Sequence, residues 1–145
     1  MTAKPNDLLE AELTNSVIGS FYDVYGELGF GFREYIYALA LERDLVAQGH
    51  RVEREVSVMI FFRGEPLARQ TLDMIVDEKL VIEIKSTEFL RPNATSQLFS
   101  YLHATNLEVG LLLHFGREPR FYRVVYENRL KRQRVKRRPT QAQRE

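Results

Sequence analysis

The sequence predicts one α/β domain in which helices flank a mixed β-sheet. Three observations predict it: segments rich in β-branched residues follow one another between residues 50 and 85, an apolar run occupies residues 108–115, and segments with helical periodicity precede and separate them. The resulting order is α-α-β-β-β-α-β-(β), in which a strand–helix–strand crossover joins parallel neighbours. With 145 residues, 44% of them hydrophobic and 28% charged, the chain fits a single soluble domain with a substantial core.

The first two predicted elements are helices. Thr14 or Asn15 can cap a helix that continues to about Leu28, because apolar residues recur there at spacings of 4, 3 and 4. A second helix is predicted over residues 32–48, and Gly49 ends it. Its apolar residues lie on two faces: Ile36, Leu39, Ala40 and Val46 on one, and Ala38, Leu41 and Leu45 on the other. We therefore expect this helix to be packed between other elements on both sides.

Three strands are expected next. They are "HRVEREVSVMIFF" at residues 50–62, "QTLDMIV" at residues 70–76 and "LVIEIK" at residues 80–85, and the turn sequences "RGEP" and "DEK" separate them. Their order predicts consecutive antiparallel hairpins at the start of the sheet.

A helix and one or two further strands complete the predicted domain. The helix starts at Asn93 or Thr95 and ends near Thr105. The segment "EVGLLLHF" at residues 108–115 is almost wholly apolar, which is typical of a central strand buried on both faces. The segment "RFYRVVY" at residues 120–126 is a candidate last strand.

The composition and the N-terminus exclude several classes of protein. The chain has no cysteine, which excludes disulfides and thiolate metal sites and is consistent with a reducing compartment. The N-terminal "MTAKPNDLLEAEL" contains no apolar segment of signal-peptide length. No apolar run approaches the roughly 20 residues needed to span a membrane. We therefore expect a cytoplasmic protein that has no membrane partner.

Charge is unevenly distributed along the chain. The net charge is +1, yet residues 129–145 contain eight basic residues and one acid, so residues 1–128 carry −6. The domain is expected over residues 14–128, after a flexible lead-in at residues 1–13. The basic tail that follows is interpreted either as a solvated, disordered end or as a phosphate-binding arm, and the two interpretations are compatible. The arm would use Arg129, Lys131, Arg132, Arg134, Lys136, Arg137 and Arg138.

Three charged residues interrupt two otherwise apolar strands. If "DEK" at residues 77–79 is the loop of a tight hairpin, Asp73 faces Glu83 directly, and Lys85 points to the same face. Like charges that face each other destabilise a sheet, and a divalent cation removes that penalty. The alternative is an ordinary carboxylate–lysine pair on a solvated sheet face, and the pattern alone leaves both open.

Two helical segments carry further candidates, each with a structural alternative. Glu34 is either a first-turn acid that interacts favourably with the helix dipole or a carboxylate directed inward as a metal ligand. Tyr37, one turn later, is explained equally well by core packing. Gln97 and Tyr101 lie four residues apart on one helical face, either as part of an ordinary amphipathic helix or as a polar pair that lines a site. The three histidines show no metal-ligand spacing.

These residues resemble a known pattern. The motif D-x9-E-I-K that begins at Asp73, followed by a Q-x3-Y helix, resembles the PD-(D/E)XK nuclease superfamily and is similar to its RecB-like branch. The segment "GFREYIY" at residues 31–37 resembles the signature of the GxxExxY protein family. The segments "VERE", "LVIEIKS", "QLFSYL" and "GLLLHFG" are similar to further blocks of that family, in its order. The resemblance covers about residues 15–126. It implies a restriction-endonuclease-like α-β-β-β-α-β core, here with an extra N-terminal helix and the basic C-terminal tail.

The resemblance also implies an activity and a set of roles. It implies a metal-dependent nuclease that hydrolyses phosphodiester bonds of nucleic acid, with DNA as the expected substrate. Asp73 and Glu83 would hold Mg²⁺ (or Mn²⁺), with the backbone carbonyl of Ile84 as a further ligand. Lys85 would position the attacking water, and Glu34 would be an additional ligand or an acid beside the metal. The residues expected to line the site are Gln97, Tyr101 and Tyr37.

Two other classes of function stay open. The chain could be a non-catalytic nucleic-acid or protein binding module that retains the nuclease fold, which predicts no Mg²⁺ or Mn²⁺ binding at millimolar concentration. Alternatively, the charged residues form a network that fixes strand register, so that Glu83→Gln lowers thermal stability with or without metal. A metal site predicts little loss, or a gain, in metal-free buffer. The sequence also leaves a homodimer open.

Overall fold

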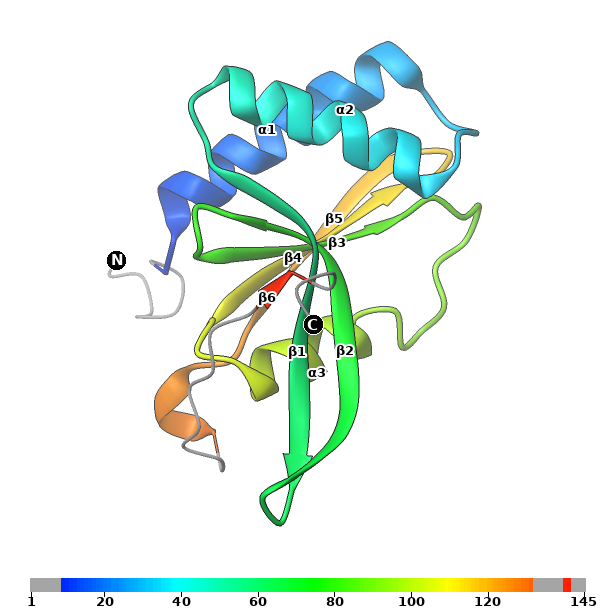
Figure 1. Ribbon diagram of the computed structural model, residues 1–145. Helices are drawn as coiled ribbons and strands as arrows, with labels where there is room; N and C mark the ends of the chain where they lie inside the picture. Colours follow the sequence, from blue (N-terminus) through cyan, green and yellow to red (C-terminus); the bar gives the residue numbers. More distant parts are fainter. Residues whose placement is uncertain (1–8, 132–139, 142–145) are drawn as a thin grey trace, which may run out of the picture.

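The computed structural model describes residues 9–131 and 140–141 of the chain (Figure 1). Within this part, one sheet contains six strands in the spatial order β5-β4-β3-β2-β1-β6. The strands are β1 (Val52–Phe62), β2 (Glu65–Val76), β3 (Leu80–Lys85), β4 (Val109–Phe115), β5 (Pro119–Val125) and β6 (Thr140–Gln141). Helices lie on both faces of the sheet, so the architecture has three layers.

The sheet is mixed because one crossover interrupts a series of hairpins. Strands β3 and β4 are parallel, and every other neighbouring pair is antiparallel. The crossover contains α3 (Ser96–Ala104), as the strand–helix–strand pattern predicts. The expected mixed α/β fold of the restriction-endonuclease-like type is therefore confirmed.

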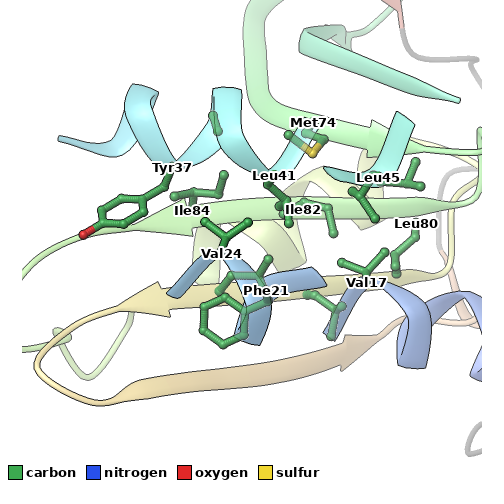
Figure 2. Close-up of a cluster of buried hydrophobic side chains, with 14 of the residues drawn as sticks. Val17, Phe21, Val24, Tyr37, Leu41, Leu45, Met74, Leu80, Ile82 and Ile84 are labelled. Atoms are coloured by element: carbon green, nitrogen blue, oxygen red, sulfur yellow. The ribbon is translucent and has the colours of Figure 1, made fainter. Parts of the chain in front are cut away.

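Two helices cover one face of the sheet. Helices α1 (Ala11–Leu28) and α2 (Glu34–Ala47) lie side by side above β3 and β4 (Figure 1). Figure 2 shows their apolar side chains meeting those of the strands in one core. This first core includes Val17, Phe21, Val24, Leu41, Leu45, Met74, Leu80, Ile82, Ile84 and Leu113. Burial of this size is the main force that holds the two helices on the sheet.

Helix α2 differs from the prediction in one respect. Its face with Tyr37, Ala38, Leu41 and Leu45 is buried, as the periodicity indicates. On the other apolar face, Ala40 packs against the first core, but Leu39 is 44% exposed and Val46 is 53% exposed. The expectation that α2 is packed on both sides was therefore wrong. The reason is that the described layers above the sheet end with α2.

Helix α3 covers the opposite face of the sheet and builds a second core. Its members are Val56, Val58, Leu72, Ile75, Val81, Leu98, Tyr101, Leu102, Leu107 and Leu112. Gly110 of β4 allows the helix to approach closely, since a Cβ at this position would lie 2.6 Å from Cδ1 of Leu98. Any larger residue there would push α3 away from the sheet.

Strands β1 and β2 form a hairpin that projects beyond the rest of the sheet (Figure 1). Strand β2 begins at Glu65, five residues earlier than the sequence predicts, because "EPLAR" pairs with β1 although its residues are exposed. Arg63 and Gly64 form the turn with positive φ angles of 52° and 80°. An apolar pattern could not reveal this arm, since its pairing depends on backbone hydrogen bonds and not on burial.

The segment after β5 departs from the expected loose tail. A 3-10 helix spans Asn128–Leu130, and β6 pairs with β1. Lys131 is 4% exposed, and its Nζ donates to the carbonyls of Thr105 and Leu107. This lysine therefore anchors the chain after β5 and is not an exposed phosphate contact. In the described residues, no helix combines the length and the apolar character needed to cross a bilayer.

Candidate active site

The hairpin of β2 and β3 has the predicted register. Val76 pairs with Leu80, and two further pairs continue the ladder as far as Met74–Ile82. Asp77 and Glu78 form the turn with positive φ angles of 53° and 57°. Asp73 and Glu83 come one step beyond the last paired residues, where the two strands begin to separate. The register therefore brings both carboxylates to the same end of the hairpin, as the sequence indicates.

Asp73 ties the two separating strands together through its side chain. Its Oδ2 accepts a hydrogen bond of 2.7 Å from the backbone N–H of Ile84. This bond replaces the ladder hydrogen bonds that the diverging backbones no longer make. It also holds the Asp73 carboxylate at the edge of β3, next to the strand that carries Glu83 and Lys85.

The side chains of β1 and β2 change faces of the sheet at the level of Asp73. Met74 and Val76 belong to the core under α1 and α2, whereas Leu72 belongs to the core under α3, although strict alternation would put all three on one face. On β1, Arg54 pairs with Met74 and Val56 with Leu72, but the ladder omits the intervening Glu55. Glu55 has a φ of 55°, which is rare for a residue with a side chain.

Glu55 is a candidate site residue that the sequence analysis did not identify. Its left-handed conformation costs on the order of 1–2 kcal/mol, and such conformations cluster at functional sites. Its negative charge contributes to raising the pKa of Asp73. The segment "VERE" contains Glu55, but regular alternation would have placed it with the face opposite to Val56. Only the backbone angle shows where it lies.

Glu83 and Lys85 project from β3 on the face away from α1 and α2. Glu83 is 4% exposed, and its Oε2 lies 3.3 Å from Nζ of Lys85. Its other oxygen, Oε1, is buried and accepts no hydrogen bond from the described residues. A buried carboxylate oxygen without a protein partner is costly unless a proton, a water or a cation satisfies it.

The electrostatics of the site favour added positive charge. Burial is the main cause that raises the pKa of Glu83 to about 7, and the charge of Asp73 adds to the effect, while Lys85 opposes it. Burial likewise raises the pKa of Asp73, against the opposing effect of the hydrogen bond from Ile84. The carboxylates of Glu34 and Glu55 add further negative potential. Such a cluster is relieved by protons or by a divalent cation.

Glu34 joins this cluster from a different layer of the fold. It is the first residue of α2 and is exposed. Its charge contributes to raising the pKa of both Asp73 and Glu83. The N-terminal end of a helix carries partial positive charge, which favours an acid there. The exposed position of Glu34 in the first turn of α2 fits the helix-dipole interpretation, and its role as a metal ligand stays a prediction.

Gln97 and Tyr101 have separate positions although they share a helix. The Nε2 of Gln97 donates to the carbonyl of Thr71, two residues before Asp73. Gln97 and Lys85 also line one pocket of about 210 Å³. Tyr101, in contrast, is fully buried in the core under α3, and its hydroxyl has no hydrogen-bond partner among the described residues. Gln97 therefore lies at the edge of the site, and Tyr101 lies behind it.

Tyr37 supports the loop before α2 and does not line the site. Its side chain is fully buried, and its ring stacks on Phe115 with a centroid distance of 4.1 Å. Its hydroxyl donates to the carbonyl of Gly29 and accepts a bond of 3.2 Å from the N–H of Phe32. The structural alternative for Tyr37 is therefore the observed one. By fixing this loop, Tyr37 positions the start of α2 and with it Glu34.

The residues of the predicted basic arm lie apart from this cluster or outside the described residues. Arg129 is exposed and forms an ion pair with Glu127 at 3.1 Å. Lys131 is buried, as described above. The remaining arm residues, Arg132, Arg134, Lys136, Arg137 and Arg138, lie outside the described part of the chain.

The donor atoms of the cluster determine which metal ion it suits. Within residues 9–131 and 140–141, no three histidine, aspartate or glutamate side chains already form a group that could hold an ion. The donor set nevertheless fits a hard divalent cation, because it consists of carboxylate oxygens. The Oε1 of Glu83, which has no hydrogen-bond partner among the described residues, is the atom that such a cation would stabilise most.

Comparison with known proteins identifies the class. A family model described as the PD-(D/E)XK nuclease superfamily matches residues 11–130, which is most of the chain. The protein therefore belongs to the PD-(D/E)XK nuclease superfamily. Among curated proteins, none matches the chain.

A solved structure has a similar fold. The chain is similar to the protein in the crystal structure of SSO0001, with a TM-score of 0.51 and 25% sequence identity. The match covers 81% of this chain and 59% of SSO0001, so the chain spans about three fifths of that protein's length.

Proposed function

We propose that this protein is a Mg²⁺- or Mn²⁺-dependent nuclease that hydrolyses phosphodiester bonds of DNA. The observation that carries the proposal is the buried Oε1 of Glu83, which has no hydrogen-bond partner among the described residues and belongs to a carboxylate that pairs with Lys85. Membership of the nuclease superfamily supports the same chemistry. The order of the sequence motifs supports a place in the GxxExxY branch of that superfamily.

The site residues take distinct roles in this proposal. Asp73 and Glu83 are the main metal ligands, with the backbone carbonyl of Ile84 as a further donor and Glu34 as an additional acid. A bound divalent ion would lower the pKa of a coordinated water and offset the charge of the scissile phosphate. The Asp73–Ile84 hydrogen bond keeps one ligand fixed before metal binds. Such preorganisation lowers the cost of assembling the site.

The proposed role of Lys85 depends on whether a metal ion is bound. Without metal it pairs with Glu83 at 3.3 Å. A cation bound at Glu83 would free the ammonium group of Lys85 to orient the attacking water and to stabilise the charge that develops on the phosphate. Lys85 is 30% exposed in its side chain, so it can reach a substrate at the surface.

Cleavage assays test the proposal. Single-stranded, duplex and branched DNA, with matched RNA, are incubated with Mg²⁺ or Mn²⁺ and either wild type, Asp73→Ala or Lys85→Ala. We expect both variants to lose at least about 100-fold in rate, the scale for removing one group that stabilises transition-state charge.

Lys79→Ala is the matched control for Lys85→Ala. Lys79 belongs to the same hairpin but lies exposed in its turn, at the end of β3 away from the site. It should retain the wild-type rate. If Asp73→Ala and Lys85→Ala cut as fast as wild type, the assignment is wrong. If no substrate is cut and no metal binds at millimolar concentration, the non-catalytic binding module replaces it.

A further inference from the structure

A groove leads away from the candidate active site along the outer face of α3. It consists of two pockets, one of about 210 Å³ beside Lys85 and one of about 610 Å³ between the β1 arm and α3. Asn93 and Ser96 line both pockets, which makes the groove continuous. The larger pocket has the volume of a typical small-molecule site.

The larger pocket presents a supported aromatic ring. Phe99 lines it and is 45% exposed. The ring is stacked on Tyr126 with a centroid distance of 4.7 Å and an interplanar angle of 11°. His103 also lines the pocket, and its ring contacts Tyr126 edge-on at 5.1 Å. Because Tyr126 holds both rings, the face that Phe99 shows to the pocket is preorganised for stacking.

Polar groups surround this ring. Asn93, Thr95, Ser96 and Ser100 contribute side-chain donors and acceptors, and Met59, Ile60 and Phe61 of β1 form the facing apolar wall. An apolar slot with a flat ring and a polar rim suits a planar, polar-edged molecule. Nucleobases have this character, since they stack by their faces and hydrogen-bond by their edges.

The charge along the groove suits a polyanion. Residues 1–128 carry a net charge of −6, and the neighbouring candidate site is rich in carboxylates. In contrast, none of the described residues that line either pocket is acidic, and the smaller pocket contains Lys85 and Arg91. Phe89 lines the same pocket with 79% of its surface exposed. The groove therefore offers a cation beside an aromatic ring, which matches the phosphate–base repeat of a nucleic acid.

From this arrangement we propose that the groove binds single-stranded nucleic acid next to the scissile phosphate, with one unpaired base stacked on Phe99. Arg91 contacts a backbone phosphate between that base and Lys85. A base in a duplex is stacked and paired already and cannot enter such a slot without being extruded. The inference rests on the proposed nuclease function for the position of the scissile phosphate, and it adds a preference for single strands or for single-stranded ends.

Binding measured without cleavage tests the inference. Fluorescence anisotropy in EDTA gives the Kd of wild type and Phe99→Leu for a labelled oligothymidylate and for a duplex of the same length. Phe99→Leu keeps most of the apolar volume but removes the aromatic ring. We expect Kd for the single strand to rise at least about fivefold, the lower end for losing one stacked base. The duplex Kd should change by less than twofold.

Two matched variants show that the effect belongs to this ring. Phe99→Tyr keeps an aromatic face and should bind like wild type. Phe121→Leu changes a comparably exposed phenylalanine, 38% exposed on β5, whose ring contacts Tyr22 edge-on at 6.4 Å. It too should bind like wild type. Arg91→Ala should weaken binding and reduce the slope of log Kd against log salt by about one.

The outcomes separate this inference from the proposed function. Wild-type protein that fails to bind the single strand in EDTA, or Phe99→Leu that binds both nucleic acids like wild type, overturns the inference even if the enzyme cuts DNA. Equal weakening for single strand and duplex overturns it as well. If wild type cuts nothing with either metal but shows the Phe99-dependent binding, the groove stands and the nuclease proposal fails.

Discussion

The two faces of strand β3 differ completely in chemistry. Leu80, Ile82 and Ile84 are buried under α1 and α2 in a core of complementary apolar side chains (Figure 2). The opposite face carries Glu83 and Lys85 beyond the single apolar Val81. The first face stabilises the fold, whereas the second includes a buried carboxylate oxygen without a hydrogen-bond partner among the described residues. One six-residue strand therefore combines an apolar core face with a charged face.

This difference indicates how the site is held. A strand anchored on one face by apolar burial can tolerate an electrostatic cost on the other. The neighbouring strands show a similar division, since β1 and β2 turn over at Glu55 and Asp73, where the carboxylates gather.

The largest effect on stability is expected on the apolar face. Ile82→Ala should lower the free energy of unfolding by about 2–5 kcal/mol, because it leaves a cavity in the core under α1 and α2. Urea unfolding measures the loss. Leu67→Ala is the control, since Leu67 of β2 is 65% exposed and should change the free energy of unfolding by less than about 0.5 kcal/mol. A similar loss for both variants would contradict the proposed role of this face.

Removing the negative charge on the polar face of β3 should raise the free energy of unfolding, whereas Ile82→Ala lowers it. The pKa of Glu83 is raised from 4.5 to about 7, so the folded state binds more protons than the unfolded state between these values. Stability of the metal-free wild type therefore falls as the pH rises from about 4.5 to 7.

Glu83→Gln lacks this loss. The difference in the free energy of unfolding between Glu83→Gln and wild type, both in EDTA, should therefore shift in favour of the variant by roughly 1–3 kcal/mol between pH 4.5 and pH 8. Thermal and urea unfolding across this pH range measure the difference. If Glu83→Gln instead loses stability at every pH, with or without metal, the residues form a structural charge network and not a metal site.

Bound metal should stabilise the folded protein by offsetting the negative charge on the polar face of β3. At a concentration ten times Kd, Mg²⁺ or Mn²⁺ should raise the free energy of unfolding of wild type by about 1.4 kcal/mol, because it binds only the folded state. The rise in Tm should be smaller for Glu83→Gln, which has lost one ligand. K⁺ at matched ionic strength separates site binding from general screening. An equal rise in wild type and variant would show that the ion does not bind at Glu83.

The smallest effect on stability is expected at Glu55, where the side chains of β1 and β2 change faces of the sheet. Glu55→Gly should raise the free energy of unfolding by up to about 1 kcal/mol, since glycine adopts a φ of 55° without the Cβ penalty. Glu55→Ala keeps the strain and removes only the charge, so it separates the two contributions. Urea unfolding measures both variants. A loss of stability in Glu55→Gly would mean that contacts of the side chain outweigh its backbone strain.

Much of the site could be predicted because local patterns control it. The turn sequence "DEK" set the pairing of β2 with β3, and the register brought Asp73 and Glu83 to one end of the hairpin, as expected. Lys85 follows Glu83 on the same face because side chains alternate along a strand. Gln97 was placed at the site edge by the same helical spacing that placed Tyr101, which proved to be buried.

The failures have a shared physical origin. The exposed face of α2 and the burial of Lys131 depend on which surfaces other parts of the chain cover, and the early start of β2 at Glu65 depends on backbone pairing with β1. Periodicity shows that a face is apolar but not whether anything packs on it. The position of Glu55 depends on one backbone angle that the surrounding residue pattern does not predict.

The amino-acid sequence by itself determined the order of elements, the mixed sheet and the pairing that unites Asp73, Glu83 and Lys85, because hydrophobic periodicity and turn chemistry act over short distances. Only the tertiary structure decided that the charge of Glu34, from another layer, adds to the electrostatics of Glu83, and that Glu83 is buried with one oxygen that has no hydrogen-bond partner among the described residues. It alone also opened a groove beside α3 toward Lys85. These features arise from contacts between residues far apart in the chain, where burial changes the electrostatics of groups that look ordinary in sequence.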